Sequence, residues 1–157
     1  DHLSWRFLAR SLAKQQRYTE AIAANNKAIE LLPYHVDYIF EKIGTLIAAK
    51  KYPEALSELK KLEVRQYRRS DRPFDLINMR YQLHTQQNTN DEFLAFLASY
   101  EVQATGYTSE LKGDALFRLQ RIQLALESYL EARKLGGGTP ELEDKIKTTE
   151  RALGSKE

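Results

Sequence analysis

Apolar residues recur along the chain at steps of three and four positions, which places their side chains on one face of an α-helix. The spacing is clear over Trp5, Leu8 and Leu12, and again over Ile43 and Leu46. No segment alternates apolar and polar residues as a strand does, and no Asn-Gly hairpin signal is present. The pattern therefore predicts an all-α chain of about four antiparallel helix pairs and one further helix. The predicted helices cover residues 3–15 with 18–32, 36–50 with 53–67, 74–87 with 90–103, 107–119 with 122–135, and 140–153.

The residues that interrupt helices stand at the predicted joints. Pro53 falls in a first helical turn, where its missing N–H is not needed, and Pro73 opens the third pair. Gly136–Gly138 can end a helix, because glycine adopts the left-handed conformation without strain. Thr139 and Pro140 then supply an N-cap and a first-turn proline. The final helix is apolar on one stripe only, so we expect it to cap the end of a stack.

The chain repeats itself with a period of 34 residues. The segment Arg17–Ile22 aligns with Lys51–Leu56, in which Tyr52 stands 34 positions after Tyr18. A third copy, Arg121–Leu126, follows 70 residues after the second, which is two periods with two residues inserted. A period of this length indicates stacked units, none of which can bury its apolar face alone.

The repeated unit resembles the tetratricopeptide repeat, a family of helix–turn–helix units of this length. The resemblance implies a right-handed superhelix of helix pairs (a solenoid) with a C-terminal capping helix. The sequence departs from the family pattern at Leu12 and Asn25, where an aromatic residue is usual. Its third unit lacks recognisable small residues at the positions where the family has them. The matching residues are Trp5, Leu8, Ala9, Ala21, Ala28 and Pro33 in the first unit, Gly44, Tyr52 and Ala55 in the second, and Gly113, Leu116, Ala125, Tyr129 and Ala132 in the fourth.

The resemblance predicts a single domain over residues 1–157, with units at about 2–35, 36–69, 73–106 and 107–138 and a capping helix at about 139–153. Small residues are expected where two helices of a pair approach closely. These are Ala9, Gly44 and Gly113 on first helices, and Ala21, Ala55 and Ala125 on second helices. Because Asp1 stands almost directly inside a helical pattern, we expect the chain to be a fragment of a longer protein.

The residue types and their spacing do not indicate a catalytic site. The three histidines, His2, His35 and His84, lie far apart and do not have metal-ligand spacing. The chain has no cysteine, no GxSxG motif and no phosphate-binding glycine loop. We therefore predict a non-enzymatic protein without catalytic residues, metal or cofactor.

The charges are balanced overall but divided along the chain. Lysine and arginine total 24 against 22 acidic residues, but residues 1–72 carry a net +5 and residues 73–157 a net −3. A net charge of +2 does not indicate a nucleic-acid binder. One basic run is interleaved with a tyrosine that can stack on a base, and we interpret it as a solvated loop between repeats. It comprises Arg65, Tyr67, Arg68, Arg69 and Arg72.

Membrane insertion is not expected, because mean hydropathy is −0.58 and no apolar run reaches the length of a span. The compartment stays open between the cytoplasm and a bacterial periplasm, because a chain without cysteine suits both.

The first helices of such pairs line an inner groove, and the residues off their packing stripes are candidate ligand contacts. Arg6, Arg10 and Lys14 stand four positions apart and so share one helix face, which favours an acidic ligand at this end. Some family members clamp a chaperone's C-terminal carboxylate with Lys and Asn, but Arg10 replaces the Asn, so we do not expect that use. The candidate groove residues are Arg6, Arg10, Lys14, Tyr38, Lys42, Asn78, Tyr81, Glu110 and Asp114.

These observations favour a protein-interaction module or scaffold that binds a peptide or a partner protein in its concave groove. An alternative is a structural or self-association (homo-oligomer) role, because Leu3 and Phe7 on the first helix have no expected neighbour. A third hypothesis is a regulatory repeat region of a larger multidomain protein.

Overall fold

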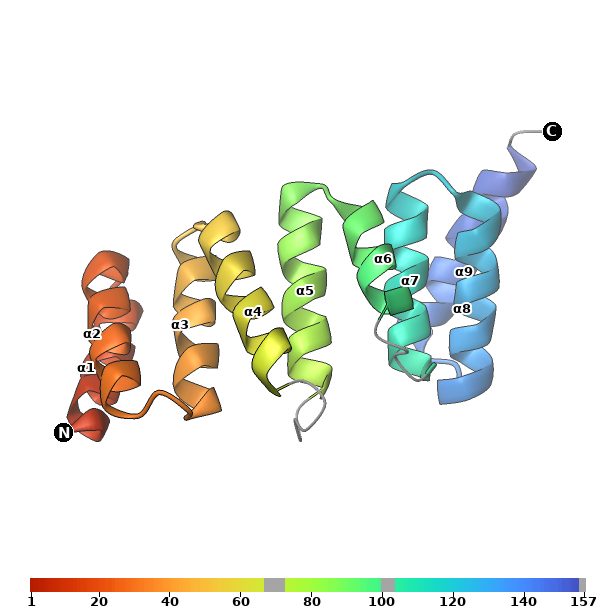
Figure 1. Cartoon of the computed structure of the whole chain (residues 1–157). Coiled ribbons are helices and arrows are strands. Elements are labelled where there is room, and N and C mark those ends of the chain that lie inside the picture. The colour runs from red at the N-terminus through yellow and green to blue at the C-terminus, as the bar shows by residue number, and fades with distance from the viewer. Residues whose placement is uncertain (67–72, 100–103, 156–157) are drawn as a thin grey trace. The chain divides into compact units, whose positions relative to one another are not determined.

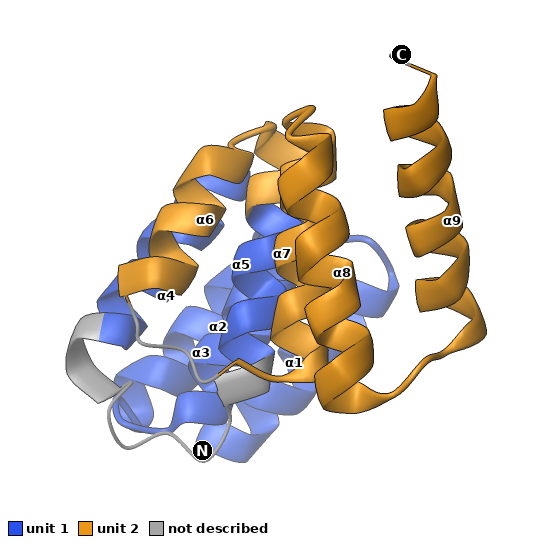
Figure 2. Cartoon of the chain, turned by 90° about the vertical axis from the view of Figure 1, so that its right-hand side faces the viewer, with its two compact units in different colours: residues 1–83 blue, residues 84–157 orange. Residues whose placement is uncertain are grey.

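The computed structural model describes residues 1–66, 73–99 and 104–155, and the regular structure in these ranges is α-helical (Figure 1). Every predicted helix is present and starts within one residue of its predicted position. The chain divides into two compact units, Asp1–Leu83 and His84–Glu157 (Figure 2). The helices are α1 (His2–Lys14), α2 (Tyr18–Leu31), α3 (Val36–Ala48), α4 (Tyr52–Gln66), α5 (Pro73–Gln87), α6 (Asn90–Ser99), α7 (Gly106–Arg118), α8 (Ile122–Gly136) and α9 (Pro140–Gly154).

Unit 1 contains the α1–α2 pair, the α3–α4 pair and most of α5. Small side chains make the first contact: Ala9 of α1 and Ala21 of α2 are 2% and 0% exposed and pack together with Leu12 and Ala24. The larger cluster joins α3, α4 and α5, and is filled by branched and aromatic side chains. Its buried members are Phe40, Ile43, Leu46, Ala55, Leu59, Leu62, Leu76 and Leu83.

The turn inside each pair has the same backbone conformation in all four pairs. One residue takes a left-handed φ between 56° and 61°: Gln16, Lys50, Asn88 and Gln120. The N–H of the next residue then donates to the carbonyl five positions back at 2.9–3.0 Å, as Arg17 does to Leu12. Gln16 and Lys50 stand 34 residues apart. The α5–α6 pair has the same turn, so it is a repeat of the same kind although its sequence signature is weak.

Unit 2 packs α7 against α8 and α8 against α9. Gly113 allows the α7–α8 contact, because a Cβ there would meet the Tyr129 ring at 2.5 Å. The capping helix begins as the sequence predicts: the Thr139 side chain accepts a hydrogen bond from the Leu142 N–H at 3.2 Å, and Pro140 follows in the first turn. The buried cluster consists of Leu116, Ala125, Tyr129, Ala132, Leu142 and Ile146.

Gly44 corrects one expectation about close helix contacts. It is exposed, and a Cβ placed on it would meet no atom within 4 Å. The reason is that α3 packs into the core through Ile43 and Leu46, whereas Gly44 lines an open hollow beside α1. The other predicted small residues are buried. The single domain and the repeat boundaries given above stay predictions.

Candidate functional site

A groove opens in unit 1 among α1, α3 and α5, the first helices of three successive pairs. Its volume is about 370 Å³, which is within the range of small-ligand pockets. Charged and amide side chains alternate around it, with two apolar side chains among them. The lining residues are Arg6, Arg10, Asp37, Phe40, Glu41, Asp75, Asn78, Met79 and Gln82.

Glu41 of α3 lies at the centre of the groove's charge arrangement. The Arg6 Nε donates to both Glu41 carboxylate oxygens at 2.9 and 3.1 Å, and the Arg10 Nη2 donates to Oε1 at 2.7 Å. The hydrogen bond to Glu41 raises the pKa of Arg6, against the opposing effect of burial. The Arg6 guanidinium also lies 5.2 Å from the centre of the Tyr38 ring. One carboxylate thus holds two guanidinium groups from the neighbouring helix.

The predicted basic stripe is therefore corrected in one respect. Arg6 and Arg10 do not present free charge, because Glu41 pairs with both. Asp37 and Asp75 line the same groove, so its formal charge is two positive against three negative groups. Reading each helix of the sequence by itself missed Glu41 as a groove residue. The 34-residue period could have indicated it, because Glu41 occupies the position in the second repeat that Phe7, the neighbour of Arg6, occupies in the first.

Tyr38 and Lys42 do not face the groove as the sequence analysis expected. The Tyr38 side chain is 1% exposed, its hydroxyl lies 2.6 Å from His2 Nδ1, and its ring stacks on His35. Its large ring fills space in the core instead of meeting solvent. Lys42 pairs with Glu58 of α4 at 3.2 Å, which holds the two helices of the second pair together.

The remaining predicted residues of unit 1 differ in their surroundings. Asn78 is exposed and lines the groove. Lys14 is exposed beside a neighbouring hollow of about 420 Å³, which it shares with Arg10. Tyr81 is partly buried and does not line the groove.

Glu110 and Asp114 of unit 2 pair with the capping helix. The Lys145 ammonium donates to Glu110 at 2.7 Å and to Asp114 at 3.0 Å, and Asp114 also accepts from the Tyr129 hydroxyl at 2.8 Å. Burial alone would lower the pKa of Lys145, but the hydrogen bonds to the two carboxylates outweigh it and the pKa is raised. These acidic groups therefore join α7 to α9.

Comparison with known proteins identifies similar structures but no similar sequence. No protein-family model matches the chain, and no curated protein matches it. The solved structure "MamA MSR-1 C2" is 17% identical and aligns over 98% of this chain and 87% of its own with a TM-score of 0.64. The structure "MamA AMB-1 P212121" gives 17% identity, 98% and 82% coverage, and a TM-score of 0.63. A thermophilic TPR protein of Thermus thermophilus aligns at 14% identity over 95% of this chain and 98% of its own, with a TM-score of 0.42.

The 34-residue period, the repeated left-handed turn and the small side chains at the helix contacts decide the fold. The chain has the tetratricopeptide-repeat fold. In this fold α1, α3, α5 and α7 are the first helices of their repeats. The groove of unit 1 therefore lies on three successive first helices of this fold.

The basic run falls outside the described residues, which exclude 67–72 and the side chain of Arg65. In the described part of the chain, no group of three or more histidine or acidic side chains could hold a metal ion. In the same part, no helix is both long enough and apolar enough to span a membrane.

Proposed function

We propose that this chain is a non-enzymatic protein-interaction module that binds a peptide or partner protein in the groove of α1, α3 and α5. The observation that carries the proposal is the groove itself, with about 370 Å³ of space and exposed polar side chains from three successive repeats. The tetratricopeptide-repeat fold supports it, because solenoids of stacked repeats form extended concave binding surfaces.

The groove's chemistry favours an extended ligand of mixed charge. The Arg10 side chain is 53% exposed, and a guanidinium has five N–H donors, so it can receive a ligand carboxylate while it stays bound to Glu41. Asn78 and Gln82 are exposed amides that can bind a peptide backbone. Asp37 and Asp75 favour a basic residue next to the acidic one. The acidic part of the ligand would thus face Arg10, with Lys14 exposed at the neighbouring hollow.

A charge-reversal experiment tests the groove. The full chain is screened against an array of random peptides of mixed charge, and the best binders are titrated by fluorescence anisotropy. We expect Arg10→Glu to weaken binding about tenfold or more, because it replaces a charged hydrogen-bond donor by a repelling group. Arg17→Glu is the matched control: its side chain is 51% exposed, is paired with Glu20, and does not line the groove. Equal losses in both variants, or no peptide that binds, would reject the groove proposal.

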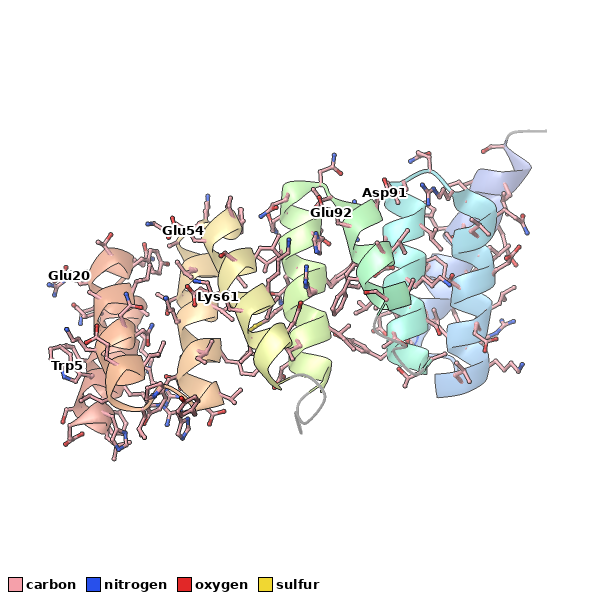
Figure 3. The ribbon with its side chains drawn as sticks, viewed as in Figure 1. Trp5, Glu20, Glu54, Lys61, Asp91 and Glu92 are labelled. Carbon is pink, nitrogen blue, oxygen red and sulfur yellow. The ribbon has the colours of Figure 1, made fainter. Side chains whose placement is uncertain are left out.

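Self-association is a second candidate, favoured by the apolar character of α1 on more than one side. Ala9 and Leu12 face α2, yet Leu3, Phe7 and Leu8 are 46%, 64% and 44% exposed. Trp5 is 37% exposed and projects from α1 on the side away from α3 (Figure 3). Several large exposed apolar side chains on one helix are typical of an interaction site. We propose that a second copy covers this face, because one self-complementary patch closes a two-fold dimer.

The mass in solution tests this second candidate. Light scattering over a range of concentrations should give a monomer–dimer equilibrium, and Phe7→Asp should shift it to the monomer. Tyr34→Asp is the control, since Tyr34 is 80% exposed in the loop after α2. A mass that stays monomeric at every concentration would exclude self-association through α1.

A further inference from the structure

Unit 2 contains a second groove, between α6 and α8 with α7 beneath it; both views place these helices side by side (Figures 1 and 2). Its volume is about 460 Å³. We propose that it binds an amphipathic helix of a partner protein that carries lysine or arginine along one flank. This site is separate from the groove of unit 1, so the proposal goes beyond the function proposed above.

The walls of the groove are apolar and open. Leu94 and Leu97 line it from α6, and Leu124 lines it from α8 with 49% of its surface exposed. Leu116 of α7 lies beneath them and is 4% exposed. An accessible apolar surface with a polar rim is typical of a site that a partner's apolar side chains fill.

An acidic pair lies along the α8 side. Glu127 and Glu131 stand four positions apart, so both project on the same side of α8. Among the described residues neither has an ion pair, and Glu127 accepts only a 3.3 Å hydrogen bond from Gln123. Two basic residues one helical turn apart would match this pair. Lys112 of α7 also lines the groove without an ion pair in the described part of the chain, and it would meet an acidic residue of the ligand.

The spacing of the lining residues favours a helix as the ligand. On α8 they stand at positions 124, 127, 128 and 131, and on α6 at 94, 97 and 98. Side chains at steps of three and four positions form ridges on α6 and α8, and a helix of a ligand can pack between two such ridges. An amphipathic helix presents its own apolar residues at the same steps of three and four positions. Apolar contact, acidic flank and ridge spacing thus indicate the same ligand.

The test uses a designed peptide of about 14 residues, or four helical turns. It carries leucine at steps of three and four positions and two lysines four positions apart beside that stripe. One control peptide has the same composition in scrambled order, one has glutamate in place of both lysines, and one has a central proline, which breaks a helix. Fluorescence anisotropy with the full chain should show binding of the designed peptide at least about tenfold tighter than of every control peptide, because each control removes a feature that the groove recognises.

Variants locate the binding on the protein. Leu124→Asp and the double variant Glu127→Lys with Glu131→Lys should each weaken binding at least about tenfold, because each removes a central contact. Their controls are Leu31→Asp on α2, where the leucine is 54% exposed, and Glu150→Lys on α9, which is exposed and outside the groove. Circular dichroism confirms that each variant is folded; if Leu124→Asp is not, Leu124→Ser replaces it.

The outcomes separate this proposal from the first. Loss of binding in both groove variants, with Arg10→Glu unchanged, supports a helix site in unit 2. Tight binding of the proline peptide would show that an extended chain is preferred, and would overturn the proposal. Equal binding of the scrambled peptide, equal loss in the control variants, or no binding at all would overturn it too.

Discussion

Two glycines on first helices of the fold have opposite surroundings. A Cβ on Gly44 would meet nothing within 4 Å, whereas a Cβ on Gly113 would lie 2.5 Å from the Tyr129 ring. Glycine inside a helix costs up to about 1 kcal/mol relative to alanine. We therefore expect Gly44→Ala to raise the free energy of unfolding by about 0.5–1 kcal/mol and Gly113→Ala to lower it by about 1–3 kcal/mol. Urea titration of both variants checks this, and two changes of the same sign would contradict it.

A buried ion pair in unit 1 was not predicted from the sequence. The Arg80 Nε and Nη2 donate to the two oxygens of Glu63 at 2.7 and 2.6 Å, and the side chains are 8% and 5% exposed. Glu63→Gln removes the negative charge that these two guanidinium nitrogens contact, and should lower the free energy of unfolding by about 3–5 kcal/mol.

The double variant Glu63→Leu with Arg80→Met is the control for this pair. It removes both charges, so we expect it to unfold at a urea concentration close to that of the unchanged protein. A double variant as unstable as Glu63→Gln would mean that side-chain shape, and not charge, decides the stability of this site.

At the scale of the helices, the turn inside each pair contains one residue in the left-handed conformation. Lys50 takes a φ of 58°, a conformation that costs a residue with a Cβ roughly 1–2 kcal/mol and glycine almost nothing. Lys50→Gly should therefore raise the free energy of unfolding by about 1 kcal/mol. Asn88→Gly should raise the free energy of unfolding by less, because asparagine tolerates this left-handed conformation. Thermal melts compare the two, and destabilisation by Lys50→Gly would reject the argument.

The attachment of α9 to α7 depends on pH through Lys145. Its pKa is raised in the folded state, so the stabilisation is complete below the unfolded pKa of about 10.4 and is lost as the pH rises through the folded value. The difference in unfolding free energy between the protein and its Lys145→Gln variant should thus stay constant through neutral pH and shrink as the pH rises above about 10.4. Lys147→Gln, an exposed change on α9, should show no such trend. A difference that stays constant with pH would show that Lys145 acts through packing.

The helices could be predicted from the sequence because their signals are local. The three- and four-residue spacing, the proline in a first turn and the Thr139 cap each act over a few residues. The candidate site could be predicted only in part, since its charges are set by pairs between helices. Arg6 with Glu41 and Lys42 with Glu58 join residues 35 and 16 positions apart. A helical wheel shows which face carries a charge, but does not show which neighbour neutralises it.

At the scale of the whole chain, the two compact units have separate buried clusters, and each cluster draws its residues from one unit. In stacked repeats, stability comes from each repeat and its nearest neighbours. Damage to one cluster should therefore unfold the repeats around it and leave distant repeats folded. The single tryptophan, Trp5, lies in unit 1 and can report on that unit alone.

Ala125→Arg tests this independence. Ala125 is 0% exposed in the cluster of α7, α8 and α9, so an arginine there cannot be accommodated. We expect the variant to lose roughly half of its helical circular dichroism while the unfolding transition seen by Trp5 fluorescence stays close to that of the unchanged protein. Glu150→Arg, which adds the same side chain at an exposed position of α9, should change neither signal. If the Trp5 transition is lost together with the helical signal, the two units fold as one cooperative body; if neither changes, Ala125 does not lie at the helix contact.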